Sequence, residues 1–395
     1  ALIKSPARRV SGSIFADYLI HIAVGYEHSF ALSSATGMLD EAQLMLFRSD
    51  LSALGELSTL DSADISRMTM QRSRELNSRS RYAKDDISVM STAAWGGTGP
   101  KPMPHNKEAM PAEAALQPPA EGEWPAWSYG EKGMRGEYAA DEVLEEIYIS
   151  LTESDNWKSA AQDLFNLFAS SGTGVLLRSR TLECRTDGQR AWLEEAAQNE
   201  CAVQLSCQER ARQTLSEQVI AFMRGTKPSC VLIYGPEAMG KATLARAMAD
   251  EFPELRLIQA CPMNGAEIRS LFAYLGAQPL RFMLLMENAD TYSPAWRALL
   301  NECTGAAVPQ NVMCVATSSS AAGFAGFPVR IGLENMELDA FAKTAEELST
   351  ARAPYIDTDA AWIRNAAVDY QLDPHDEFNV SSASLIAARF IAAHE

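Results

Sequence analysis

Apolar residues in the C-terminal half of the chain follow two spacings in turn. Short and nearly continuous apolar runs predict buried parallel strands at residues 230–234, 255–259, 282–286, 311–316 and 329–331. Between these runs, apolar residues recur every three or four positions, as on one face of a helix. Strands that alternate with helices form a parallel sheet with helices on both faces. We therefore expect an α/β fold here, followed by a helical segment that ends near residue 393.

The N-terminal half shows helical spacing instead. It predicts apolar helices at 14–32 and 39–57, a polar helix at 62–82, and further helices between 136 and 200. Residues 92–130 differ, because their many Pro, Gly and Ala residues cannot build a core of their own. Three tryptophans in this stretch are interpreted as anchors on a partner. The stretch therefore predicts docking on the protein subunits of a large assembly.

These patterns divide the chain into five parts, and at 395 residues it is long enough for two or three domains with cores of their own. We predict a helical extension at 1–91, a Pro/Gly/Ala-rich docking segment at 92–135, a helical domain at 136–200, an α/β core at 201–350 and a helical lid at 351–395.

Charge is distributed unevenly along the chain. The net charge is −17, and residues 108–395 account for all of it, because residues 1–107 hold nearly equal numbers of acids and bases. An acidic surface repels phosphate backbones, which argues against nucleic-acid binding by the C-terminal body. The polar helix is the exception, since its segment 67–81 carries five arginines. This segment predicts either an RNA-binding face or a solvated or protein-facing one, and it lacks the aromatic residues of a single-strand-binding surface.

Composition excludes several classes of protein. The seven cysteines form no C-x-x-C pair and the five histidines no metal-type spacing, so we expect reduced thiols and no zinc site. No apolar run reaches the length of about 18 residues that a membrane span needs. Residues 1–16 contain three basic residues and no acid, a bias typical of the region near the cleavage point of an organellar presequence, although a trimmed chain would look the same. This bias predicts a mitochondrial location, with a cytoplasmic one as the alternative.

The strongest chemical motif is the segment 235–243, Gly-Pro-Glu-Ala-Met-Gly-Lys-Ala-Thr. It follows a predicted strand and precedes a predicted helix, which is the context of a phosphate-binding loop of the form G-x-x-x-x-G-K-[ST]. In such a loop, backbone N–H groups surround phosphate oxygens, the lysine reaches the outer phosphates and the final hydroxyl ligates Mg²⁺. Here the lysine is present but the hydroxyl position is occupied by alanine. The nucleotide-binding residues that we predict, with ATP or ADP as the ligand, are Gly235, Met239, Gly240, Lys241, Ala242 and Thr243.

A second motif follows the predicted strand 282–286. A phosphate-loop ATPase needs an acid there for the Mg²⁺ shell, and usually a second carboxylate that orients the attacking water. Glu287 stands where the first acid is expected and is the candidate residual Mg²⁺ ligand, with a buried acid in a polar network as the alternative. Asn288 replaces the second carboxylate, and the strand at 311–316 is followed by hydroxyl side chains instead of an amide. We therefore expect little Mg²⁺ binding, and Glu237 in the loop should weaken phosphate binding further.

From about residue 141 to its end, the chain resembles the AAA+ ATPases and, among them, a bacterial-type family known only as a domain of unknown function. The resemblance rests on the order and spacing of QERARQTLSEQVIAFMRG at 208–225, ELRLI at 254–258, FMLLMEN at 282–288, NVMCVATSS at 311–319 and SLIAARFIA at 384–392. It implies an AAA+-like parallel sheet with helices on both faces and a small helical lid, preceded by a mostly helical N-terminal region.

The resemblance also implies which positions are catalytic in the family. Its members carry Gly-Thr-Gly-Lys-Ser in the loop, two aspartates at the second motif, an asparagine after the next strand and an arginine early in the last helix. The matching positions here hold Ala-Met-Gly-Lys-Ala at 238–242, Glu-Asn at 287–288, Ser319 and Leu385. Arg330 is the nearby candidate for an arginine finger, and an ordinary surface residue is the equal alternative.

Three functions are consistent with these residues. The favoured one is a catalytically degenerate ATPase, not an enzyme, that serves as a structural accessory or assembly subunit of a larger mitochondrial complex and retains nucleotide binding. The first alternative is an active AAA+ ATPase that remodels a protein partner, with Thr243 or a water replacing the missing hydroxyl. The second is an RNA-associated subunit of an organellar ribonucleoprotein that uses the segment 67–81.

Overall fold

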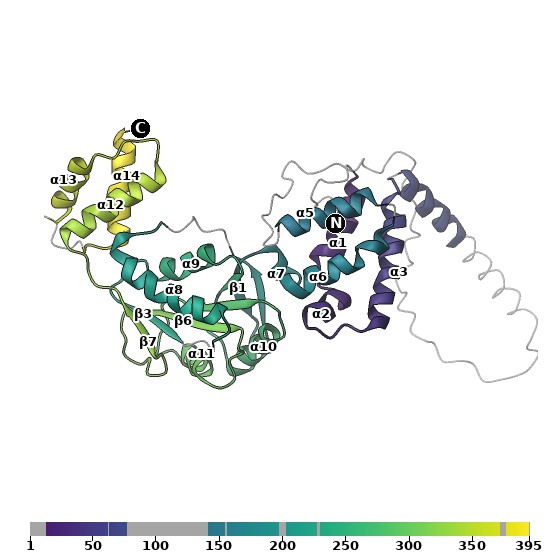
Figure 1. The fold of residues 1–395 in the computed structure, drawn as a ribbon, viewed down its shortest axis with the longest axis horizontal. Coiled ribbons are helices and arrows are strands. Elements are labelled where there is room, and N and C mark those ends of the chain that lie inside the picture. The colour runs from purple at the N-terminus through teal and green to yellow at the C-terminus, as the bar shows by residue number, and fades with distance from the viewer. Residues whose placement is uncertain are drawn as a thin grey trace, which may run out of the picture. The chain divides into compact units, whose positions relative to one another are not determined.

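The computed structural model describes residues 13–61, 63–76, 141–154, 156–196, 203–226, 230–371 and 377–394. The predicted docking segment at 92–135 and the end of the arginine-bearing helix lie outside these residues, so both stay predictions. The described residues fall into two compact units, the first from within 1–24, 46–135 and 148–161, and the second from within 25–45, 136–147 and 162–395. Figure 1 labels the elements of both units.

The first unit is helical. Its residues come from α1 (Ile14–Gly25), α3 (Glu41–Ser58), the helical backbone at 63–76, α5 (Asp141–Glu153) and η1 (Trp157–Ala160). Gly55 of α3 faces Trp157, and a Cβ at Gly55 would lie 3.1 Å from the indole ring. Trp157 is almost fully buried by this close packing. The helix predicted at 39–57 is confirmed by α3, whose bounds differ from the predicted ones by at most two residues.

One predicted helix is wrong, because residues 14–32 form two helices. After α1, the chain turns extended at His28 and begins α2 (Ser29–Ala35). His28 Nδ1 accepts a hydrogen bond from the N–H of Ala31 at 3.3 Å and so caps the new helix. Such a cap satisfies an N–H that has no partner within the helix, which the apolar spacing alone did not indicate.

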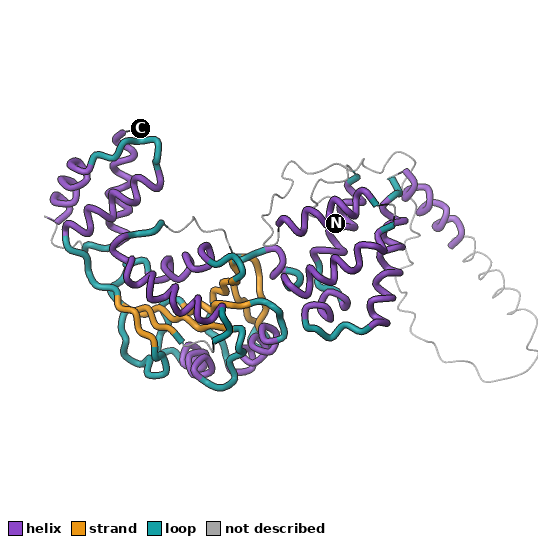
Figure 2. The backbone as a smooth tube through the Cα atoms, in the orientation of Figure 1, coloured by secondary structure: helices purple, strands orange, loops and turns teal. Residues whose placement is uncertain are grey.

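The second unit contains the sheet, which Figure 2 shows in orange. Within the described residues it has seven strands in the order β2-β1-β4-β5-β6-β3-β7. Every neighbouring pair is parallel except the edge pair of β2 and β1. The strands are β1 (Thr181–Thr186), β2 (Ala191–Glu195), β3 (Val231–Tyr234), β4 (Leu255–Gln259), β5 (Arg281–Met286), β6 (Val312–Ser318) and β7 (Val329–Gly332).

The five predicted strands correspond to β3 through β7, but β1 and β2 fall inside the segment 136–200 that we expected to be helical. That expectation is corrected for residues 181–195. Only α6 (Ala161–Ser171), α7 (Val175–Arg178) and the helices before them fit it. Arg185 of β1 forms ion pairs with Glu183 and Glu194 on the exposed hairpin face. Because charged residues occupy this face, β1 and β2 lack the continuous apolar run that identifies the central strands in the sequence.

Helices cover both faces of the sheet. On one face, α8 (Glu209–Met223) and α9 (Lys241–Glu251) pack on side chains such as Met283 and Leu285 of β5. On the other, α10 (Gly265–Gly276) and α11 (Pro294–Thr304) pack on Leu284 and Met286 of the same strand. Successive residues of a strand point to opposite faces, so one continuous apolar run supplies both cores. Figure 1 shows the two helical layers.

The lid consists of α12 (Leu338–Arg352), α13 (Ala360–Gln371) and α14 (Val380–His394), so its first helix begins well before the predicted boundary at 351. Phe341 of α12 stacks on Phe378 with ring centroids 4.5 Å apart and is fully buried. The buried lid side chains belong to the same apolar cluster as those of α8 and α9. Among the described residues, no helix is both long and apolar enough to cross a membrane.

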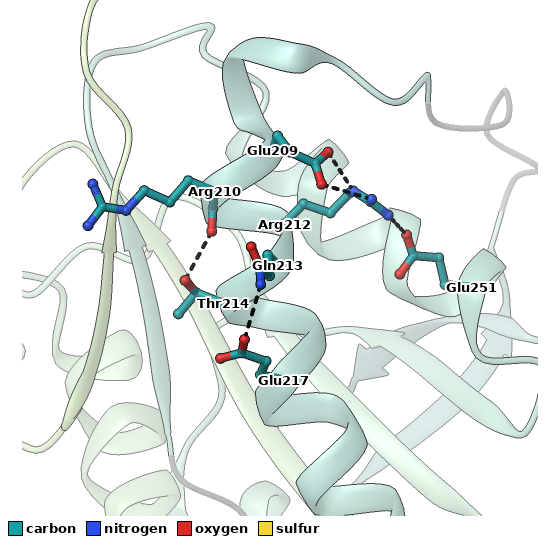
Figure 3. A network of polar contacts seen from close by, with 7 residues as sticks. All are labelled: Glu209, Arg210, Arg212, Gln213, Thr214, Glu217 and Glu251. Atoms are coloured by element: carbon teal, nitrogen blue, oxygen red, sulfur yellow. Dashed lines mark hydrogen bonds and ion pairs between the residues drawn. The ribbon is translucent and has the colours of Figure 1, made fainter.

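An ion-pair network fixes α8 against α9. Figure 3 shows Arg212 between Glu209 of its own helix and Glu251 at the end of α9. These contacts favour the charged form of Arg212 and so raise its pKa. The hydrogen bond to Glu209 is the largest cause of this rise, followed by the one to Glu251. The network holds the last turn of α9, while its first turn carries the phosphate-loop residues.

Candidate functional site

The motif at 235–243 forms a tight turn between β3 and α9. Gly235 has φ +147° and Gly240, the residue that caps α9, has φ +75°. A Cβ at Gly235 would lie 2.2 Å from the carbonyl oxygen of Leu333, and one at Gly240 would lie 2.7 Å from Gln208 Nε2. Only glycine combines these φ angles with such close approach. The loop therefore has the geometry that the sequence motif predicts.

Two other segments hold the loop in place. The buried side chain of Gln208, before α8, donates from Nε2 to the carbonyl oxygen of Met239 at 2.6 Å. Ser381, at the start of α14, donates its N–H to the carbonyl oxygen of Ala238 at 3.3 Å. Ala238 itself has φ +56°, a left-handed conformation that is uncommon for alanine. The loop is thus fixed both by the core and by the lid.

Lys241 is buried at the base of the loop, with 7% of its surface exposed. Its Nζ donates to the carbonyl oxygens of Gly235 at 2.9 Å and Pro236 at 2.5 Å. Burial lowers the pKa of the ammonium, and the charge of Glu237 opposes this shift only in part. No carboxylate of the described residues lies within ion-pair distance of Nζ. A buried cation with neutral partners is suited to receiving an anion.

A cavity of about 690 Å³ opens on the lid side of the loop. Ala238, Gly240 and Thr243 line it, so Thr243 is exposed to this cavity. Its other walls include Val203 and Leu205 before α8, together with residues at the C-terminal end of α12 and the start of α14. A cavity with both apolar walls and polar groups has the general character of a small-molecule site.

A second cavity, of about 880 Å³, opens at the carboxyl ends of β5 and β6. Lys241 and Glu237 line it together with Asn288 and Asp290. Ser319, at the position matched to the family asparagine, also lines this cavity and brings a hydroxyl instead of an amide. Lys241 thus lies at the second cavity, and Ala238 of the phosphate loop lines both cavities.

The second motif follows β5, and its acid pairs with a residue of α9 that the sequence analysis did not name. Glu287 follows β5 and forms an ion pair with Arg246 of α9. Asn288 has φ +47°, and its N–H donates to Oγ1 of Thr317 at 2.8 Å. Thr317 is buried at the end of β6, and its carbonyl oxygen accepts from the N–H of Ala289. The chain after β5 is therefore fastened to β6.

The residues do not fit the Mg²⁺ ion that the resemblance implies. Ala242 offers no oxygen, and Glu287 is engaged by a guanidinium. Within the described part of the chain, no group of three or more His, Cys, Asp or Glu residues could hold a metal ion. At a phosphate loop, Mg²⁺ takes one or two protein oxygens beside phosphates and waters; here the side-chain hydroxyl is absent at Ala242 and the acid is paired with Arg246.

Two positions were considered for a functional arginine: Arg330, the candidate arginine finger, and Leu385, which is matched to an arginine of the family. Arg330 of β7 donates to the carbonyl oxygens of Phe327 and Phe324 in its own loop, at 3.3 and 3.2 Å. Leu385, matched to the arginine of the last helix, is 46% exposed. The lid arginine that lines the first cavity is Arg352 of α12, which donates to Oγ of Ser384 at 2.8 Å.

Sequence reasoning missed Gln208, Arg246 and Arg352. Gln208 opens the segment 208–225 that carries the resemblance, but nothing in its spacing indicates a bond to the loop. Arg246 follows Ala242 by one helical turn, and this spacing is a signal that could have been used. Arg352 is far from the loop in sequence, so only the packing of the lid brings it there.

Comparison with protein families agrees with this geometry. Residues 185–321 match the model of a family described as "Protein of unknown function (DUF815)". This segment contains the phosphate loop and strands β2 to β6 of the sheet. The match covers the phosphate loop and the chain after β5 and β6, and it ends before the lid. The comparison with curated proteins gives no match.

Several solved structures are similar to part of this chain at low identity. A mutant of Thermotoga maritima RuvB has a TM-score of 0.37 and 17% identity, over 46% of this chain and 61% of that one. The Thermotoga maritima RuvB Holliday junction branch migration motor has a TM-score of 0.36, 17% identity and the same coverages. The FIGL-1 AAA domain in complex with ADP has a TM-score of 0.31 and 16% identity, over 49% of this chain and 86% of that one. This chain thus spans about three fifths of the RuvB chains.

Proposed function

We propose that this protein is a catalytically degenerate AAA+-like ATPase that binds ATP or ADP without hydrolysing it and acts as a structural accessory or assembly subunit of a larger complex. One observation carries the proposal: the phosphate loop keeps its glycine geometry and its buried lysine, whereas Glu287 is paired with Arg246. The groups that hold phosphate are kept, and those that drive hydrolysis are replaced.

Nucleotide binding is supported by the loop and the first cavity. The backbone N–H groups of Gly240, Lys241 and Ala242 stand at the N-terminal end of α9, where a helix favours anions. The buried ammonium of Lys241 adds a positive charge whose partners are neutral carbonyls. Lys241 lies at the second cavity, whereas Val203 and Leu205 give the first cavity, on the other side of Ala238, an apolar wall that suits a nucleobase. ATP or ADP combines these features, with phosphates for the loop and a base for the wall.

The absence of hydrolysis is argued from three positions. Asn288 has no carboxylate to orient water, Ser319 has no amide, and Arg330 is bound to carbonyls of its own chain. An arginine finger alone contributes roughly 10³–10⁵ in rate. Since these groups act on one transition state, their combined replacement removes turnover and leaves binding.

The accessory role follows from a fold that is kept without its chemistry. An intact apolar core on both sheet faces, with the catalytic positions replaced, fits a domain retained for its shape and surfaces. The docking segment at 92–135, a mitochondrial location and RNA contact through 67–81 stay predictions. Isolation of the native protein within a multi-subunit assembly supports this role, and its isolation as a free monomer contradicts it.

Binding is tested by titrating ADP and ATP against the full chain by calorimetry. We expect saturable binding of both, weakened at least tenfold, or about 1.4 kcal/mol, by Lys241→Ala. Lys343→Ala, on the exposed face of α12, is the matched control and should bind as the wild type does. The proposal fails if neither nucleotide binds, or if Lys241→Ala and Lys343→Ala bind equally well.

A further inference from the structure

Ala242 and Arg246 lie four residues apart on α9. Residues four apart share one face of a helix, and side chains on a helix lean toward its N-terminus. Arg246 therefore extends along the face that begins at Ala242, the position of the metal-binding hydroxyl in the motif. The methyl group of Ala242 leaves this side of the helix without a polar group of its own. Arginine is the next residue on this face.

The side chain of Arg246 has an acidic partner. Its Nη2 forms an ion pair with Oε1 of Glu287, the acid that follows β5. The side chains are 27% and 30% exposed, so both charges are partly shielded from water. A metal ion at this carboxylate would therefore compete with the guanidinium for the negative charge of Glu287. The negative charge of Glu287, the predicted metal ligand, is thus already compensated by Arg246 of the same chain.

The ion pair with Glu287 engages Nη2 of Arg246, and the same side chain also borders the first cavity. Arg246 lines the 690 Å³ cavity together with Gly240 and Thr243. Its Nε–H is buried without a hydrogen-bond partner among the described residues. A buried donor without a partner is costly, and this cost leaves the guanidinium less firmly held than a fully paired one. Arg246 therefore brings a positive charge to the cavity wall beside the phosphate loop.

We propose that Arg246 is the resident cation of the nucleotide site and takes the place of the divalent metal, so that ADP and ATP bind as metal-free anions. The proposal rests on the proposed function, because it requires that the loop binds nucleotide. It commits the site to a ligand class, the free nucleoside di- or triphosphate, instead of its Mg²⁺ complex. Glu287 then acts as a positioning residue that orients the guanidinium and does not contact a metal.

The test measures ADP affinity in excess MgCl₂ and in excess EDTA. For the wild type we expect dissociation constants that agree within about threefold between the two buffers. Arg246→Ala should weaken ADP binding about tenfold or more in EDTA. Arg246→Lys keeps the charge and should recover part of the loss. Glu287→Gln should leave binding insensitive to Mg²⁺.

The matched control is Arg364→Ala. Arg364 of α13 also forms an ion pair with a carboxylate, that of Asp339, but its side chain is 60% exposed and does not line the cavity. This variant should bind ADP as the wild type does. Thermal unfolding of each variant separates a loss of the site from a loss of the fold, and Arg246→Lys serves if Arg246→Ala does not fold.

The outcomes separate this inference from the proposed function. ADP binding that requires Mg²⁺, or is unchanged in folded Arg246→Ala, overturns the inference and leaves the proposed function standing. Binding in neither buffer overturns both. Equal binding in MgCl₂ and EDTA, together with weaker binding by Arg246→Ala, supports the inference.

Discussion

At the scale of single residues, neighbours decide what a side chain can do. Lys241 keeps its place in the phosphate loop, yet with carbonyls as its partners, and Glu287 keeps its place after β5, yet paired with Arg246. The residue types alone predicted a weakened site. The structure adds the partner of the acid, since the charge of Glu287 is compensated by Arg246 of the same chain.

The thiol pair Cys184 and Cys261 gives a prediction at this scale. The hydrogen bond from Cys184 lowers the pKa of Cys261 to about 7. The same bond, together with burial on β1, raises the pKa of Cys184. The thiolate is the reactive form of cysteine. Alkylation of Cys261 by iodoacetamide should therefore rise as the pH passes through about 7, as followed by peptide mass spectrometry.

Two controls accompany this measurement. Burial raises the pKa of the partly exposed Cys207, so its labelling should begin only at higher pH. Cys184→Ala removes the donor and should move the labelling of Cys261 upward in pH. A Cys261 profile that is the same with and without Cys184 would show that the pair does not control this thiol.

At the scale of elements, the β3-loop-α9 unit depends on its glycines. Gly235→Ala places a Cβ against the carbonyl of Leu333, which is backbone and cannot rotate away. A residue held in a disfavoured backbone conformation costs about 1–3 kcal/mol, and the clash adds to this. We expect a loss of about 3 kcal/mol or more in the free energy of unfolding, measured by denaturant titration.

Gly188→Ala is the matched control for this prediction. Gly188, in the β1–β2 turn, also has a positive φ of +89°, but a Cβ added there would have no atom within 4 Å beyond its chain neighbours. Backbone strain alone should cost about 1 kcal/mol at this position. Equal losses in the two variants would mean that the contact with Leu333 does not constrain the loop.

The elements that sequence predicted, and those it did not, differ in how they are buried. Strands β3 to β6 are covered on both sides, so they are mostly apolar in sequence, whereas the edge strand β7 is buried only in part. The β1–β2 hairpin has a charged face, as Arg185 and Glu194 show, and lacks such a run. The Asp187–Gly188 pair, a common hairpin turn, was the signal that could have revealed it. The end of α1 was missed because a side-chain cap, not spacing, begins α2.

The site shows the same limit. Its glycines and lysine are close together in sequence, so the motif predicts their geometry. Gln208, Arg246 and Arg352 act through side chains that meet distant segments, and only the packed sheet and lid bring those segments together. The spacing of residues within one segment of the sequence therefore does not predict such contacts.

At the scale of the whole molecule, the sheet and the lid share one apolar core in the second unit. Phe341 is fully buried in it and stacks on Phe378 and Tyr370. Phe341→Ala should lower the free energy of unfolding by about 3–5 kcal/mol, since it leaves a large cavity. The exposed Leu385→Ala should change it by less than about 0.5 kcal/mol. A small effect of Phe341→Ala in calorimetry would contradict a shared core.

The central claim is that the loop holds nucleotide without hydrolysing it, and the fate of bound ATP tests it most directly. Radiolabelled ATP is incubated with the full chain, and the bound and free nucleotides are then separated and identified over time. We expect bound nucleotide to be recovered as ATP, and phosphate release to match that of Lys241→Ala. Steady formation of ADP by the wild type that disappears in Lys241→Ala would contradict it.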